Sequence, residues 1–196
     1  MPTASAGLRV SSPEPLMGIR GGHAFEVGFD GVQVPAAQRL GPEGGGFKIA
    51  MKVLDNSRLD VAATALGLAE AALAAARQWA NDRLIGGEPL ASRQGIQWML
   101  ADMKLRLEAS WALTMQALAL REAGQPFTLQ SAMAKLHASE MAGFVTDAAL
   151  QIHGGYGYTR ALPLERHVRD ARILRIYEGS SEIQRTIIAR AVLAEG

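Results

Sequence analysis

The stretch LDVAATALGLAEAAL, residues 59–73, decides the fold class of this chain. Its apolar residues recur at intervals of three and four, which is the spacing of one face of an amphipathic α-helix. Alanines and Gly67 fill most remaining positions, and such small side chains allow a second helix to approach closely. The stretch therefore predicts a long core helix, with these residues on its buried face: Leu59, Ala62, Leu66, Ala69 and Leu73.

Helical periodicity extends on both sides of this stretch, from Phe47 onward. Residues 81–89 and 124–126 interrupt it, so we expect three long antiparallel helices joined by short loops. Thr128 is the expected N-cap of the third. A short helix near 163–174 and a last one from about Ser181 complete a mainly α, up-and-down helical bundle. The expected core faces of the second, third and last helices are Ile96, Leu100, Met103, Leu107, Trp111, Thr114 and Leu118; Met133, Leu136, Met141, Phe144, Val145, Ala148 and Ile152; and Ile183, Ile187, Ile188 and Val192.

The first 46 residues differ in composition, because they are rich in glycine and proline and contain short alternating runs. Residues 24–29 and 32–34 alternate in this way around Asp30-Gly31, a turn signal, and so predict a short β-hairpin that ends at Pro35. The glycine-rich residues 41–46 lack the pattern of a phosphate-binding loop and are interpreted as a linker. We therefore expect two parts: a β-fragment with linker at 1–46 and a helical bundle domain at 47–196.

The composition excludes several classes of function. A net charge of +1 gives no electrostatic basis for binding nucleic acid or an acidic membrane surface. The chain has no cysteine, which excludes disulfides, thiol catalysis and cysteine-ligated zinc. No apolar run is expected to reach transmembrane length, and residues 1–10 lack the features of a signal peptide. We expect a globular protein of the cytoplasm.

The candidate for chemistry is IYEGSSEIQ, residues 176–184, which places Glu178 on a glycine-containing turn between two helices. A carboxylate held on a loop by rigid helices can act as a base. In the alternative interpretation, Gly179 ends one helix, Ser180 or Ser181 caps the next, and Glu178 is a solvated turn residue. The local pattern alone favours this alternative.

Histidines offer weaker candidates. His137 and Glu140 stand three apart on one predicted helix, a spacing that can hold a metal, but no third ligand is near in sequence. We therefore expect ordinary packing for this pair and no metal site. His153 precedes two glycines and could end a helix by interacting with its C-terminal dipole. No serine lies in the Gly-x-Ser-x-Gly pattern, so a catalytic triad is not supported.

Several further motifs follow one another in a characteristic order: LDNSR at 54–58, QGIQ at 94–97, LADM at 100–103, QIHGGYGY at 151–158, ER at 165–166 and RDA at 169–171. Together with 176–184 they closely resemble the C-terminal half of the acyl-CoA dehydrogenase family, from about Gly7 to the end of the chain. The resemblance implies that residues 1–46 are the end of a middle β-domain. It also implies that FAD is the cofactor, acyl-CoA the substrate and fatty acid metabolism the setting.

In that family, the glutamate after Ile-Tyr removes the pro-R α-proton of an acyl-CoA thioester while a hydride leaves the β-carbon for flavin N5. Glu178 stands at that position. The family stabilises the enolate-like oxygen with the backbone N–H of this glutamate and a ribityl hydroxyl of FAD. Some relatives instead place the base just before the arginine matched by Arg58, where this chain has Ser57. The resemblance therefore assigns the base to Glu178.

The resemblance also implies binding residues. Those for substrate are Arg58, Asp55, Tyr177 and Gly179, although Arg58 could alternatively form a helix-surface salt bridge. Missing glycine side chains would let backbone amides approach a pyrophosphate. The implied FAD contacts, some of them across a subunit interface, are Arg83, Gln94, Gln151, Gly154, Gly155, Ser180 and Glu182.

Two departures from the family pattern weaken the cofactor assignment. Gly86 stands where the family usually has an aromatic residue after Arg83. The chain also corresponds to about half of a usual subunit, which fits a fragment, a truncated product or one piece of a split enzyme. A flavin held by half a site would have one face in water, so we expect the isolated chain to be inactive.

The implied partners are acyl-CoA, an electron-transferring flavoprotein as acceptor and further copies of the chain in a dimer or tetramer, with no nucleic acid and no membrane. Two alternatives remain. One is a catalytically silent oligomerisation module that binds no FAD alone. The other is a related flavin enzyme such as an acyl-CoA oxidase; a nitroalkane oxidase, which uses aspartate, is disfavoured by Glu178. The sequence does not indicate the acyl chain length.

Overall fold

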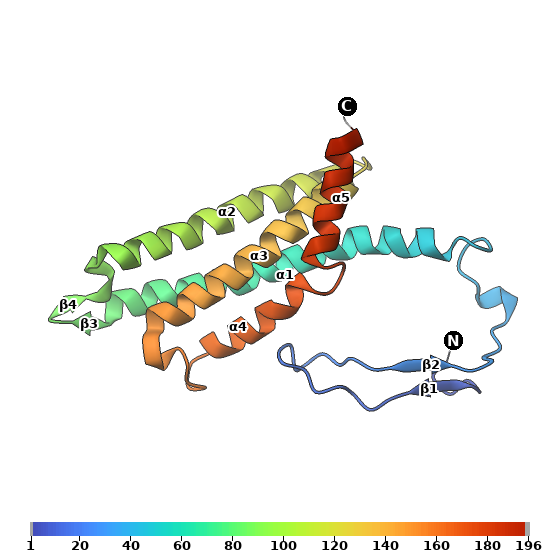
Figure 1. Cartoon of the computed structure of the whole chain (residues 1–196), viewed down its shortest axis with the longest axis horizontal. Coiled ribbons are helices and arrows are strands. Elements are labelled where there is room, and N and C mark those ends of the chain that lie inside the picture. The colour runs from blue at the N-terminus through green and yellow to red at the C-terminus, as the bar shows by residue number, and fades with distance from the viewer. Residues whose placement is uncertain (1, 195–196) are drawn as a thin grey trace. The chain divides into compact units, whose positions relative to one another are not determined.

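The longest element of the fold is α1 (Gly46–Asp82), a helix of 37 residues that contains the stretch 59–73 (Figure 1). The computed structural model describes residues 2–194. Four of the five residues predicted on the core face of α1 are buried, and the fifth, Leu73, is half-buried. The periodicity of the sequence was therefore a reliable guide to this helix.

Two further long helices pack with α1 in an up-and-down arrangement (Figure 1). They are α2 (Gln94–Glu122) and α3 (Thr128–His153). The shorter α4 (Leu164–Arg172) lies against α3 and continues into a 3₁₀ turn at Ile173–Arg175. The last helix is α5 (Ser181–Ala194). The prediction of a mainly α, up-and-down bundle is thus confirmed.

Alanine dominates the contact surface of α1. Because alanine loses no side-chain entropy on burial and occupies little space, a row of alanines lets helix axes approach closely. Six alanines of α1 are fully buried, at spacings of three and four: Ala62, Ala65, Ala69, Ala72, Ala76 and Ala80. We call this row the alanine seam. Larger residues of α2 and α3, among them Met103, Leu107 and Met141, complete the core beside it.

Two details of the predicted helices are wrong. Trp111 does not belong to the core face of α2, because its side chain is 39% exposed and the neighbouring Ser110 is buried instead. Thr128 is the first residue of α3 rather than its N-cap, which is Phe127. The Thr128 hydroxyl instead donates a 2.6 Å hydrogen bond to Asp55 Oδ2. A tertiary contact has replaced the local cap.

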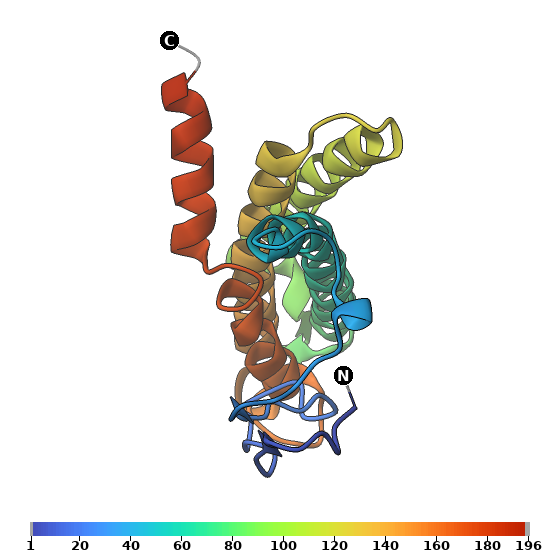
Figure 2. The same ribbon diagram turned by 90° about the vertical axis from the view of Figure 1, so that its right-hand side faces the viewer.

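The prediction for the apolar face of α5 is also wrong. Ile183 is 51% exposed and Val192 61% exposed, whereas the buried residues of the helix are Ser181 and Gln184 in its first turn. Figure 2 shows that most of α5 extends away from the other helices. Its apolar residues therefore have no partner within residues 2–194 of a single chain.

A short β-ladder joins α1 to α2. The strands β3 (Leu84–Ile85) and β4 (Glu88–Pro89) are antiparallel and are connected by Gly86 and Gly87. Both glycines have positive φ, at 64° and 87°, as a tight two-residue hairpin turn requires. This turn explains why glycine rather than an aromatic residue stands at position 86.

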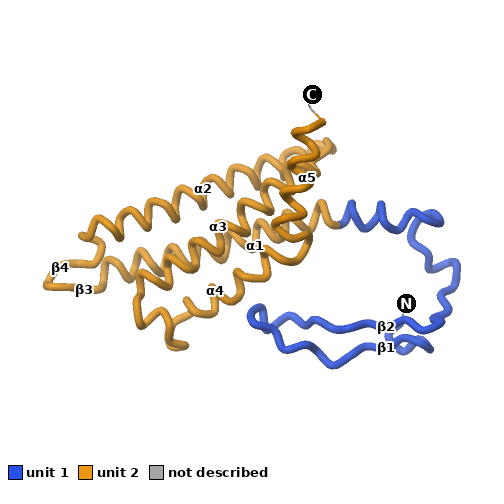
Figure 3. Tube along the Cα trace, in the orientation of Figure 1, with its two compact units in different colours: residues 1–53 blue, residues 54–196 orange. Residues whose placement is uncertain are grey.

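The chain divides into two units, residues 1–53 and 54–196 (Figure 3). In the first, β1 (Leu8–Val10) pairs antiparallel with β2 (Val27–Phe29). The predicted pairing of residues 24–29 with 32–34 is therefore wrong. Asp30 N–H donates to Gly7 O at 2.8 Å, which extends the β1–β2 pairing past Phe29 and turns the chain away from a hairpin. A further 3₁₀ turn covers Ala36–Gln38. The predicted domain division at 46/47 stays a prediction.

By length and composition alone, α1 could cross a membrane, which departs from the expectation stated above. An 18-residue window of the helix has a mean hydropathy of 1.5, and 44% of that window is buried inside the fold. The alanine seam accounts for both numbers, and a core helix of a soluble protein meets the same description.

Candidate active site

The turn between the 3₁₀ segment 173–175 and α5 holds Glu178 in an unusual backbone conformation. Its φ is +54°, in the left-handed region, and Gly179 follows with φ +88°. Glycine adopts this region freely, but for a residue with a β-carbon it costs about 1–3 kcal/mol and persists only where the surroundings enforce it. The turn is therefore fixed by its neighbours.

The Glu178 carboxylate faces α1. Ser57 Oγ donates a hydrogen bond of 2.6 Å to Glu178 Oε2, joining residues that are 121 positions apart in sequence. Glu178 is half-buried. This contact does not fit the alternative in which Glu178 is simply a solvated turn residue.

The backbone of the same turn is held by two buried side chains. Lys135 Nζ on α3 donates to Gly179 O at 2.7 Å. Gln184 Nε2 on α5 donates to Gly179 O at 2.9 Å and to Glu178 O at 3.2 Å. Both side chains are fully buried. We call this pair the carbonyl clamp.

Sequence reasoning missed the carbonyl clamp. The signal for Lys135 was its place on the buried face of α3, at helical spacing from Ser131, Ala138 and Ala142, where a lysine is out of place without a partner. Gln184 had a weaker signal, as a polar residue next to the predicted apolar face of α5. Neither pattern could name the partner, which lies on the turn.

Burial lowers the pKa of Lys135 from 10.5 to about 8, and the nearby Arg58 charge lowers it further toward that value. The carboxylates of Glu178, Glu140 and Glu182 act in the opposite direction. Lys135 is therefore still mostly protonated at neutral pH, with a positive charge close to Glu178.

A second buried cation lies on α1. The Arg58 side chain is 5% exposed, and its Nη1 contacts Asp55 Oδ1 at 2.6 Å. The helix salt bridge considered in the sequence analysis thus exists, but it is buried. Arg58 Nε has no hydrogen-bond partner among the described residues. An unpaired buried donor beside a candidate base points to an acceptor on a ligand.

The remaining predicted residues of the turn face two directions. Tyr177 is half-buried and packs against the core cluster that contains Leu59, and burial, then the Glu178 charge, raises the pKa of its phenol. Glu182 is exposed, and a hydrogen bond from Ser180 is the main cause that lowers its pKa. Ser180 and Glu182 line a shallow pocket of about 260 Å³ together with Arg172 and Arg175.

The expected packing roles of two acidic and histidine residues are visible. His137 Nδ1 lies 2.8 Å from Ser110 Oγ. Glu140 pairs with Arg175 at 3.3 Å and accepts a 2.7 Å hydrogen bond from Ser181 Oγ. Within residues 2–194, no three such side chains gather in a way that could hold a metal ion.

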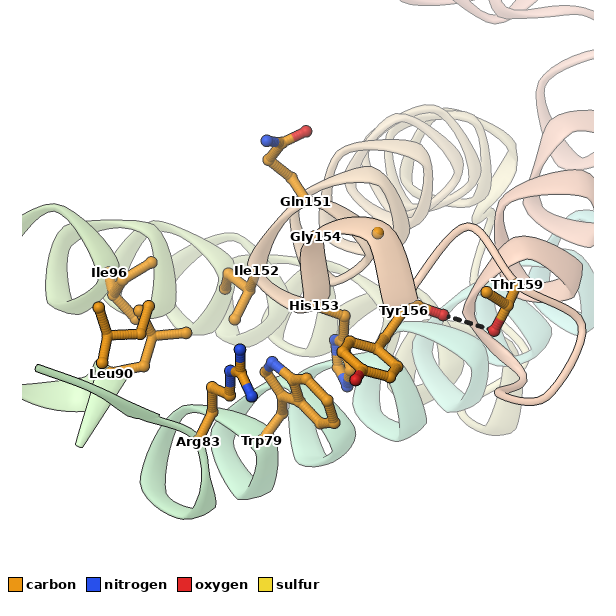
Figure 4. A pocket seen from close by; sticks show the side chains of 12 residues that line it. Trp79, Arg83, Leu90, Ile96, Gln151, Ile152, His153, Gly154, Tyr156 and Thr159 are labelled. Carbon is orange, nitrogen blue, oxygen red and sulfur yellow. Dashed lines mark hydrogen bonds between the residues drawn. The ribbon is translucent and has the colours of Figure 1, made fainter. Parts of the chain in front are cut away.

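Four of the predicted cofactor residues line a separate pocket of about 520 Å³ at the end of α3, which shares no lining residue with the Glu178 turn (Figure 4). They are Arg83, Gln151, Gly154 and Gly155. Gln94 does not line it; this exposed residue begins α2, which contributes Ile96 instead.

Aromatic rings form one wall of this pocket. Trp79 stacks on His153 with ring centroids 4.9 Å apart and contacts Tyr156 at 5.3 Å. The Arg83 guanidinium lies 6.0 Å from the centre of the Tyr156 ring. His153 ends α3 as expected, with Nδ1 at 2.7 Å from Ala149 O. In Figure 4 the Gln151 side chain points away from Trp79 and Arg83.

The chemistry of this pocket suits a phosphate-linked aromatic ligand. A β-carbon added at Gly155 or Gly154 would meet nothing within 4 Å, so a ligand can approach their backbone closely. Arg83 supplies a positive charge and the rings supply stacking surfaces. The residues present therefore fit one side of a dinucleotide such as FAD.

Comparisons with known proteins agree on one family. The profile for the acyl-CoA dehydrogenase C-terminal domain matches residues 44–193. Among curated relatives, an acryloyl-CoA reductase (NADH) of Anaerotignum propionicum is 51% identical over 187 residues, which are 95% of this chain and 48% of the relative. A mitochondrial short-chain specific acyl-CoA dehydrogenase of Bos taurus is 46% identical over 193 residues, 98% of this chain and 47% of that protein. The chain spans about half the length of these relatives.

Solved structures give the same answer. The butyryl-CoA dehydrogenase of Megasphaera elsdenii superposes with a TM-score of 0.95 at 45% identity, covering 98% of this chain and 50% of that one. A chain from a structure titled for the electron transferring flavoprotein of Acidaminococcus fermentans gives 0.95 at 42% identity, covering 98% of this chain and 51% of that one.

Proposed function

Because the chain belongs to the acyl-CoA dehydrogenase family and carries its C-terminal domain, we propose that it is the C-terminal half of an FAD-dependent acyl-CoA dehydrogenase. One observation carries the proposal beyond the family assignment. The half-buried carboxylate of Glu178 is held on an enforced left-handed turn, between a serine donor on one side and a buried cation on the other. That is the arrangement expected of an oriented base.

In the proposed reaction, the Glu178 carboxylate accepts the α-proton of an acyl-CoA thioester as the α,β double bond forms. FAD, when bound, supplies the acceptor for the hydride that leaves the β-carbon. The thioester oxygen gains negative charge as the α-proton leaves, and a correctly placed backbone N–H stabilises it. No acceptor within residues 2–194 pairs with the Glu178 N–H, so it is available for that oxygen. One side chain and its own amide thus serve the two ends of the same bond.

Arg58 and Asp55 support substrate binding in this proposal. Their ion pair is anchored by the Thr128 hydroxyl, so the guanidinium is fixed before substrate arrives. The unpaired Nε is the donor left for an acceptor on the ligand. Tyr177 and Gly179 shape the same turn on either side of the base.

For the cofactor, we propose that Arg83, Gly154 and Gly155 hold one side of FAD, with Gln151 and Gln94 toward its adenine half, and that Ser180 and Glu182 contact FAD from the turn. The two groups line different pockets of the chain. A homo-oligomer in which one chain's α3 end meets a neighbour's turn would satisfy both. The exposed apolar face of α5 supports association.

The named relatives favour a short acyl chain and an electron-transferring flavoprotein as acceptor, in the cytoplasm. Two alternatives keep specific support. A chain from the prolyl acyl carrier protein oxidase structure gives a TM-score of 0.95 at 34% identity, which keeps an oxidase open. The half-length match keeps a silent oligomerisation module open.

The proposal is tested by completing the enzyme. We would join this chain to the N-terminal half of the Megasphaera elsdenii butyryl-CoA dehydrogenase, its 45% identical structural relative. The expected product is yellow, with one flavin per chain, and butyryl-CoA bleaches the flavin under anaerobic conditions. Flavin that binds but is not reduced by any acyl-CoA from four to sixteen carbons would refute the dehydrogenase. Rapid reoxidation of reduced flavin by air would select the oxidase.

A further inference from the structure

The base candidate depends on a turn whose own sequence does not favour it. Glu178 has a β-carbon and yet occupies the left-handed region at φ +54°. In an unrestrained chain this residue would return to negative φ, and the carboxylate would swing away from Ser57. Some interaction outside the turn must therefore hold it.

The carbonyl clamp is that interaction. Lys135 comes from α3 and Gln184 from α5, and both donate to the Gly179 carbonyl, at 2.7 and 2.9 Å. Gln184 also reaches the Glu178 carbonyl at 3.2 Å. These are the two carbonyls that flank the Glu178–Gly179 peptide bond, so fixing them fixes the ψ of one residue and the φ of the next.

The clamp is costly to the fold, which argues for a purpose. Lys135 is fully buried, and burial of an ammonium group costs free energy even when it is paired. Gln184 is also fully buried, and its Oε1 has no partner among the described residues. A leucine or methionine at either place would fill the same space without these costs.

Close packing shows that the turn and the clamp fit each other. A β-carbon at Gly179 would lie 2.6 Å from Gln184 Nε2, which is too close for any side chain. The glycine is therefore needed so that the amide of Gln184 can approach the backbone.

We propose that Lys135 and Gln184 are positioning residues for the base: by holding the carbonyls of Glu178 and Gly179 they keep Glu178 in the left-handed conformation that aims its carboxylate at the substrate α-carbon. This inference rests on the proposed function of Glu178. Neither side chain touches the reacting atoms. Because a misplacement of about 1 Å in a reacting group can cost about a hundredfold in rate, the clamp affects turnover without binding substrate.

The first test uses the chain itself. NMR on labelled protein reports the φ of Glu178, since a strong intraresidue HN–Hα NOE marks a positive value. We expect this signal in the wild type and in Thr146→Val, a control on α3 that is equally buried but bonds only its own helix. Lys135→Met and Gln184→Met should lose it, and Lys135→Arg, which keeps a charged donor, should retain it. A positive φ in both methionine variants would overturn the proposal.

The second test uses the completed dehydrogenase described above. Lys135→Met and Gln184→Met should each lower kcat by about a hundredfold while KM for acyl-CoA stays within about threefold. Thr146→Val should leave both unchanged. Full kcat in the two methionine variants, where Glu178→Gln is inactive, would sink the clamp and leave the base intact. Full activity of Glu178→Gln would instead refute the proposed base, and the NMR result would still decide the clamp.

Discussion

Ser57 Oγ lies 2.6 Å from Glu178 Oε2, so the first long helix donates directly to the carboxylate of the last turn. The serine hydroxyl also lies 3.3 Å from the Leu54 carbonyl of its own helix, which competes for the same proton. The contact with Glu178 is shorter and charge-assisted, and is therefore the stronger of the two.

Ser57→Ala should lower the stability of the chain by about 1 kcal/mol, because the carboxylate loses a charge-assisted donor in a half-buried place. Urea unfolding followed by circular dichroism measures this. Ser139→Ala is the matched control, since its hydroxyl bonds only the Leu136 carbonyl of its own helix. Equal losses in the two variants would mean that the bond to Glu178 contributes nothing specific.

Glu178→Gln should retain FAD and acyl-CoA binding in the completed enzyme but lose about a hundred- to ten-thousand-fold in turnover. The amide has the same shape as the carboxylate and cannot accept the proton. Anaerobic stopped-flow reduction of the flavin measures the step directly. Wild-type rates in this variant would show that another group is the base.

Stability should depend on pH through Lys135. Its pKa is about 8 in the fold and 10.5 unfolded, so between these values the unfolded chain binds more protons. Stability relative to Lys135→Met should then rise as pH increases from 8 to 10.5, by at most about 3 kcal/mol, since one pKa unit corresponds to about 1.4 kcal/mol. Below pH 8 the difference should be flat. Urea midpoints of both proteins over this range test the sign, and a fall with pH would contradict it.

Gly179→Ala should destabilise the chain by about 1–3 kcal/mol, because the alanine needs φ +88° and its β-carbon meets Gln184 at 2.6 Å. Gly67→Ala provides the opposite control. It lies inside α1 with nothing within 4 Å of the added carbon, so it should stabilise by up to about 1 kcal/mol. Thermal unfolding of the two variants should show melting temperatures displaced in opposite directions.

Self-association should involve α5. Val192 is 61% exposed and Leu193 82% exposed, beyond the turn that holds the base. Replacing both with glutamate should shift the chain toward monomer in light scattering at micromolar concentration, while Arg190→Glu, on the same helix, should not. A wild-type chain that is monomeric under these conditions would contradict the proposed oligomer.

The sequence was a good guide wherever local periodicity determines structure. The buried face of α1, from Leu59 to Ala69, follows directly from its spacing. It was a poor guide where the partner is distant. Residues 24–29 pair with Leu8–Val10 rather than with their neighbours, because an alternating pattern marks a strand but not its partner.

The same limit applies to the candidate site. A lone glutamate on a turn could be placed by pattern and by family resemblance, but its backbone strain could not. Nor could the pattern show that Lys135, 43 positions upstream by residue number, would reach the turn, since that contact depends on how α3 and α5 pack. The apolar residues of α5 misled for a related reason: periodicity reports an apolar face, not what covers it.

The alanine seam has a consequence for the base, because Ser57 and Lys135 reach the turn from α1 and α3, which the bundle holds together. The separation of these two helices is therefore a mechanical setting of the site, and alanine fixes it without slack, having no rotamers to adjust. Ala76 is 19 residues from Ser57, or roughly 28 Å along the helix at 1.5 Å per residue. Enlarging it would act as a shim between the helices. Activity in such a protein would be sensitive to volume at positions that no ligand touches.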